Sequence, residues 1–135
     1  EYFGDAPCPL FVQEGLAMLA EGKGDPNRLV LAGAAVAEDR AVPLPDLFAL
    51  DRERLESPRL FYAQSYSFVF FLHQRLNDEQ FRDFLKHVKR GCTAGDAIQR
   101  ALCMAPQEDF LPQLHKAWQA YAVADAQIVR ALSLQ

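Results

Sequence analysis

The sequence has 135 residues, of which 50% are hydrophobic and 24% are charged, and its 18 acidic residues outnumber its 14 basic ones. This is the composition of a folded chain with a proper core, and it excludes an intrinsically disordered protein. The net charge of −4 and the lack of a basic cluster argue against nucleic acid as a main partner, and no apolar run approaches the ~20 residues of a membrane span.

The first predicted helix runs from about Pro9 to Ala20. Pro9 suits its first position, where a missing backbone N–H has no partner to lose. Glu14 falls on the apolar side of this helix and not among its exposed residues. Because an unpaired buried charge is costly, this carboxylate must be paired, protonated or bound to a cation. Glu14 is therefore the first candidate functional residue.

The second predicted helix starts at the cap formed by Asp25 and Pro26 and ends near residues 38–40. Gly33 weakens this helix slightly, because glycine has a low helix propensity. Residues 41–50 contain two prolines, and residues that precede a proline avoid the helical region. We expect this stretch to be extended or turning at first, and then to form a short helical turn that pins the loop to the core.

The most amphipathic helix begins after Ser57 and Pro58, another pair that is typical of a helix start. Its inward residues fall on one helical stripe. They are Phe61, Ser65, Phe68, Val69, Leu72 and Leu76. Phe70 and Phe71 widen the stripe, so we expect this helix to be central and covered on more than one side.

Three further helices follow. Asn77 caps the first of them and Gly91 ends it, while Thr93 caps the second. Pro112 either kinks the final helix or marks its true start. Strand signals are nearly absent. We therefore predict an all-α fold, a compact bundle of about six helices that forms a single helical domain over residues 1–135.

The segment around Glu14 resembles the Pro-x-Trp-Leu-x-Glu-Gly-Leu-Ala segment of gluzincin zinc metallopeptidases, in particular the bacterial peptidase MA-like families. In those families a His-Glu-x-x-His helix and a later glutamate hold the zinc, and that glutamate matches Glu14. Phe11 stands where Trp is usual, and Gln13 where Asn is frequent. Later features continue in the family's order, from Tyr62 to a final Phe…Trp helix, so the resemblance covers about residues 6–122. It implies the C-terminal helical subdomain of such a peptidase.

The sequence contains no His-Glu-x-x-His. His73, His87 and His115 stand alone, and we expect them to lie on helix surfaces or to make a single hydrogen bond. In the family the histidine helix precedes the glutamate by roughly twenty residues, and only thirteen residues precede Glu14. We expect either the C-terminal part of a longer protein, whose missing N-terminal segment bears the histidines, or a descendant without the metal site.

The resemblance implies that Glu14 is the third zinc ligand and that Tyr62 donates a hydrogen bond to the oxyanion of the tetrahedral intermediate. Tyr66, one turn later, competes for the second role. The simpler alternatives are a carboxylate that is salt-bridged in the core and an aromatic residue with its hydroxyl at the surface. If the roles hold, Glu14 and Tyr62 should face one cavity. Leu10 and Phe11 should then be exposed for their type, or covered by a neighbouring molecule.

Two functions remain open from the sequence. In the first, the full-length protein hydrolyses a peptide or protein substrate with a zinc-activated water, and this chain alone binds no zinc and is inactive. In the second, the chain is a non-catalytic helical module that binds a peptide or a protein. Residues upstream of Glu1 discriminate between the two, because His-Glu-x-x-His there supports the enzyme.

The cysteines are Cys8, Cys92 and Cys103, without a Cys-x-x-Cys pair that would indicate structural zinc. Cys92 and Cys103 could form a disulfide if adjacent helices bring them together. Buried free thiols are the simpler interpretation. The cysteines do not fix the compartment, and the resemblance alone points to an extracytoplasmic location.

Overall fold

The computed structural model of the chain describes residues 8–21, 26–51, 53, 55–105 and 107–133. Within these ranges it holds seven α-helices and no β-strand, which confirms the all-α prediction and adds one helix to the six expected. None of these helices combines the length and the apolar character that crossing a membrane requires. The helices are α1 (Leu10–Ala20), α2 (Pro26–Ala37), α3 (Leu44–Ala49), α4 (Pro58–Arg75), α5 (Asp78–Lys89), α6 (Ala94–Ala101) and α7 (Phe110–Ser133).

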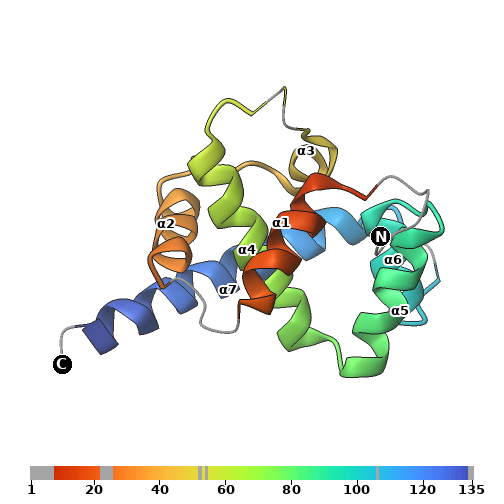
Figure 1. Cartoon of the computed structure of the whole chain (residues 1–135). Helices are drawn as coiled ribbons and strands as arrows, with labels where there is room; N and C mark the ends of the chain where they lie inside the picture. Colours follow the sequence, from red (N-terminus) through yellow and green to blue (C-terminus); the bar gives the residue numbers. More distant parts are fainter. Residues whose placement is uncertain (1–7, 22–25, 52, 54, 106, 134–135) are drawn as a thin grey trace.

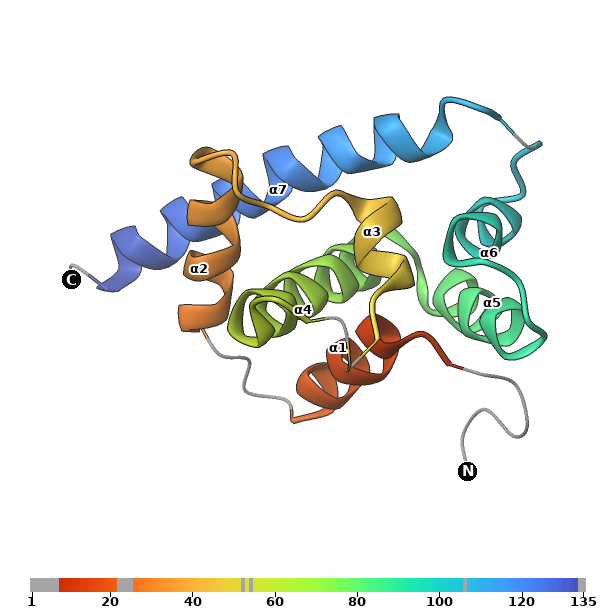
Figure 2. The same cartoon turned by 90° about the horizontal axis from the view of Figure 1, so that it is seen from above.

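Helix α4 lies at the centre of the molecule (Figures 1 and 2). Helix α1 packs on one side of it, and α7 runs along the opposite side, as the view from above shows most clearly. Helix α2 packs against both α7 and α4, while α5 and α6 pair at the other end of the molecule. The bundle therefore has three layers, with α4 in the middle one.

The central position of α4 follows from its sequence. All six residues of the predicted stripe are buried, and so is Phe71. Ser57 is the N-cap residue as predicted, but its side chain makes no capping hydrogen bond within the described residues. Burial of the wide apolar surface, and not the cap, thus stabilises this helix.

An aromatic cluster ties α1, α3 and α4 together. The ring of Phe11 stacks on Phe48 at 4.8 Å between centroids, and both rings contact Phe68, at 5.8 and 5.5 Å. Phe11 is 0% exposed and Leu10 is 8% exposed. The expectation that these two residues are exposed is therefore wrong, because α3 folds over the start of α1 and covers its apolar side from within the chain.

Two glycines allow helices to approach closely. A Cβ atom on Gly33 of α2 would lie 2.4 Å from the Cβ atom of Ala126 and 2.7 Å from the carbonyl oxygen of Ala122, both on α7. A Cβ atom on Gly15 of α1 would meet α4 in the same way. Because real Cβ atoms essentially never come so near, a larger residue would force these helices apart. Gly33 lowers the helix propensity of α2, but the close packing of α2 against α7 requires a glycine at this position.

Buried polar side chains fix two of the connections to α4. The amide of Gln64 accepts from the backbone N–H of Val42 at 2.9 Å and donates to its carbonyl oxygen at 3.0 Å, so it anchors the segment before α3. The indole N–H of Trp118 donates to the hydroxyl of Ser67 at 3.0 Å and joins α7 to α4. The buried amide of Gln64 and indole of Trp118 thereby both find partners, whereas the buried hydroxyl of Ser65 has none in the described part of the chain.

The helix ends agree with most of the sequence signals. Asn77 forms a capping box with Gln80 at the start of α5, and Gly91 ends that helix region with a φ of 93°. Pro9 is the N-cap of α1 and not its first residue, and Pro112 lies in the first turn of α7, where it is tolerated. The predicted cap at Asp25 lies outside the described residues.

Candidate functional site

The first candidate residue, Glu14, lies on α1 next to the contact between α1 and α4. Its side chain is half-buried. The neighbouring Gly15 touches α4, since a Cβ atom there would lie 2.3 Å from Cγ2 of Val69 and 2.9 Å from the carbonyl oxygen of Ser65. With Phe11 anchored in the aromatic cluster one turn earlier, the backbone of Glu14 is held on a rigid element.

The second candidate, Tyr62, lies on α4, and its side chain is also half-buried. Its ring contacts that of Phe61 at 5.7 Å between centroids. Ser65, three residues later on α4, has its backbone carbonyl oxygen next to Gly15 of α1. That the carboxylate and the hydroxyl face one cavity remains a prediction.

Tyr66 has a different environment from Tyr62. It is 4% exposed, and its ring stacks on Phe70 at 5.9 Å. It also lies close enough to Tyr121 of α7 to contribute to the raised pKa of that phenol. Tyr66 is thus part of the core between α4 and α7, where a substrate has little access to its hydroxyl.

The sequence analysis missed a hydrogen-bonded pair on α7. Burial, the charge of Asp125 and a hydrogen bond to it raise the pKa of Tyr121 to about 12. Burial also raises the pKa of Asp125, although the hydrogen bond from Tyr121 opposes this. The spacing of four residues is a signal for such a contact on a helix. A phenol that keeps its proton at neutral pH is suited to donating a hydrogen bond and not to acting as a base.

Zinc requires more ligands than this part of the chain provides. No group of three or more His, Cys, Asp or Glu side chains within the described ranges could hold a metal ion. Catalytic zinc takes three protein ligands, so Glu14 alone does not form such a site. The described residues therefore do not fit the metal by themselves, and Glu14 can serve only as one member of a larger ligand set.

Of the three histidines, only His73 is exposed, whereas His87 and His115 are half-buried, so the expected surface position is confirmed for His73 alone. His73 is exposed, and its ring contacts Phe81 edge-on at 5.2 Å. His115 is half-buried beside Trp118, at 5.8 Å between the rings. Burial lowers its pKa, and its Nδ1 atom has no hydrogen-bond partner in the described part of the chain. None of them is placed as one of a pair of zinc ligands.

All three cysteines are free thiols. The bridge between Cys92 and Cys103 that the sequence left open is not formed. Cys8 and Cys92 are half-buried, whereas Cys103 is exposed, so the interpretation as buried thiols is wrong for Cys103. Burial raises the pKa of the Cys8 thiol to about 11. Because the thiolate is the reactive form, Cys8 is a poor nucleophile.

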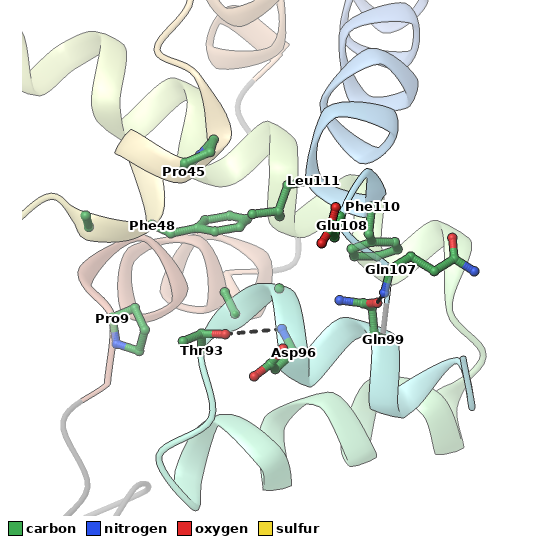
Figure 3. A pocket seen from close by; sticks show the side chains of 13 residues that line it. Pro9, Pro45, Phe48, Thr93, Asp96, Gln99, Gln107, Glu108, Phe110 and Leu111 are labelled. Atoms are coloured by element: carbon green, nitrogen blue, oxygen red, sulfur yellow. Dashed lines mark hydrogen bonds between the residues drawn. The ribbon is translucent and has the colours of Figure 1, made fainter. Parts of the chain in front are cut away.

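Cavities follow one another around the end of α3. One, of about 540 Å³, lies between α3, α6 and the start of α7 (Figure 3). A second, of about 400 Å³, lies beside the start of α1 and shares Pro9, Phe48 and Ala49 with the first. A third, of about 450 Å³, adjoins at Ala49 and Leu50. Neither Glu14 nor Tyr62 is among the residues that line these three cavities. No local sequence signal predicts the cavities, because segments distant in the sequence form them.

A family model described as the Peptidase MA superfamily matches residues 3–124, which is most of the chain and includes both candidate residues. The chain therefore belongs to the Peptidase MA superfamily, as the resemblance implied. Comparisons with curated proteins and with solved structures give no match.

Proposed function

We propose that this chain is the C-terminal helical part of a zinc-dependent peptidase, and that it supplies the third zinc ligand, Glu14. The observation that carries the proposal is the family match, because it spans residues 3–124 and contains the Glu14-Gly15 pair. The two histidines that complete a catalytic zinc set would lie outside the 135 residues. The complete protein would then hydrolyse peptide bonds, and this chain alone would not.

The packing of α1 supports this role for Glu14. A metal ligand must be held in a nearly fixed position, and helices do this better than loops. The contact of Gly15 with α4 and the burial of Phe11 fix the helix on both sides of Glu14. Glu14 is half-buried and not enclosed in the core, and a ligand that meets a separate segment must also lie outside the core.

We further propose that Tyr62 stabilises the oxyanion. Its side chain is half-buried, whereas Tyr66 is buried and lies close to Tyr121 of α7. A donor that a substrate can reach suits this role better than one in the core.

The test uses the complete gene product, in which zinc content after dialysis and cleavage of a peptide library are measured. Glu14→Gln should lose both bound zinc and cleavage. Glu21→Gln is the matched control, because Glu21 is an exposed glutamate at the end of the same helix. Tyr62→Phe should keep its zinc but lower kcat by about 10²- to 10³-fold, and Tyr66→Phe should not.

Full zinc content and full activity in Glu14→Gln would refute the ligand role. A complete protein that holds no zinc and cleaves no peptide would instead favour the second function, a non-catalytic helical module that binds a peptide or a protein.

A further inference from the structure

Two of the cavities have three lining residues in common, Pro9, Phe48 and Ala49, and we call the two together the Phe48 groove. Its walls come from segments far apart in the sequence: the start of α1, the end of α3, the start of α6 and the start of α7. Each of its two parts, of about 540 and 400 Å³, has the size of a ligand pocket.

The centre of the Phe48 groove is apolar. Figure 3 shows the ring of Phe48 reaching from α3 towards Leu111, with Phe110 beyond Leu111 and beside Glu108 at the start of α7. Pro9 and Pro45 add further apolar surface. The groove thus offers contacts to bulky apolar side chains, and it has no helix of the chain lying in it within the described residues.

The charged residues of the groove are acidic. Asp96 and Glu108 line the larger part, and Asp51 lines the smaller. All three are exposed. No Lys, Arg or His is among the described residues that line either part, although 14 basic residues occur in the chain. This one-sided charge attracts cationic ligands and repels anionic ones.

We propose that the Phe48 groove binds an extended peptide in which apolar residues alternate with Lys or Arg. In an extended chain, successive side chains point to opposite sides. The apolar ones can therefore lie on Phe48 and Leu111 while the basic ones face Asp96 and Glu108. The inference rests on the proposed function for the choice of a peptide as occupant, and it adds the class of peptide and its place of binding.

The experiment measures the fluorescence anisotropy of a labelled hexapeptide, Leu-Lys-Phe-Arg-Leu-Lys, titrated with the purified chain. Leu-Glu-Phe-Asp-Leu-Glu serves as the acidic counterpart. We expect the basic peptide to bind with an affinity that falls as salt rises, because exposed charges are screened. The acidic peptide should bind at least about tenfold more weakly.

Two variants locate the binding. Ala49→Trp places a bulky side chain at an exposed position that lines both parts of the groove, and it should weaken binding by at least about tenfold. Ala37→Trp, at the exposed end of α2, is its matched control and should change nothing. Glu108→Lys should weaken binding by about three- to tenfold, whereas Glu21→Lys on α1 should not.

Equal affinity for the acidic peptide, no binding of the basic one, or unchanged affinity in both Ala49→Trp and Glu108→Lys would overturn the inference. Circular dichroism confirms that each variant is folded. The peptide titration depends on neither zinc nor Glu14, because Glu14 is not among the residues that line the groove. The zinc experiment and the peptide titration can therefore fail independently of each other.

Discussion

Replacing Gly15 with alanine tests the close contact between α1 and α4. In an ordinary helix position, alanine is more favourable than glycine by about 0.5–1 kcal/mol. Here the added Cβ atom would lie 2.3 Å from Cγ2 and 2.8 Å from Cβ of Val69, and 2.9 Å from the carbonyl oxygen of Ser65. Carbon atoms in contact need about 3.5–4.0 Å, so α1 would have to move away by about 1 Å.

The expected magnitude follows from these two opposing effects. Overpacking of a well-packed core costs about 1–3 kcal/mol, and the gain in helix propensity offsets part of it. We therefore expect Gly15→Ala to lower the free energy of unfolding by about 1–2 kcal/mol. The backbone oxygen of Ser65 cannot rotate away, so a change of the Val69 rotamer would not remove the clash.

Urea unfolding monitored by circular dichroism measures this loss. Gly95→Ala is the matched control, because its nearest neighbour is the flexible end of Leu111, at 3.2 Å. It should leave the stability unchanged or raise it slightly. If Gly15→Ala were as stable as Gly95→Ala, α1 and α4 would not be as close as described, and the fixed position of Glu14 would lose its basis.

Three further predictions follow from the structure. Phe68→Ala should cost about 3–5 kcal/mol in urea melts, because Phe68 is 0% exposed, and a loss below about 1 kcal/mol would contradict its place in the core. Asp125→Asn should be more stable than the unchanged chain at pH 7, with the difference vanishing below pH 3.8. Burial raises the pKa of Asp125 in the folded state, so stability falls as pH rises from 3.8 through the folded pKa; an equal difference at pH 3 and pH 7 would refute this. The 135-residue chain alone should bind no stoichiometric zinc and cleave no casein, and chelator-sensitive cleavage by it would contradict the need for an outside segment.

Much of the fold could be predicted because its signals are local. The stripe from Phe61 to Leu76 placed α4 at the centre, and Asn77 and Gly91 marked the ends of α5. These signals depend on helical periodicity and on backbone chemistry at helix ends, and neither needs the tertiary structure.

The features that were missed depend on contacts between distant segments. The periodicity of α1 does not reveal that α3 will cover Phe11, because Phe48 lies 37 positions later. Helix propensity marks Gly33 as a weak point, but only its contact with Ala126 explains why glycine is needed there. The Phe48 groove is made by four separate segments, so no single stretch predicts it.

For the candidate site, the Glu-Gly pair singled out Glu14, and the chain's order of features singled out Tyr62. Their roles stay predictions. Their relative position depends on how α1 and α4 pack at Gly15, and no spacing in the sequence encodes this packing.

The most direct test of the central claim is a crystal structure of the complete gene product, with anomalous data collected at the zinc edge. We expect one zinc peak within about 2.0–2.2 Å of a Glu14 carboxylate oxygen, with the Tyr62 hydroxyl about 5–10 Å from that carboxylate. A zinc ion whose ligands do not include Glu14, or a Tyr62 hydroxyl on the opposite side of the bundle, would contradict it.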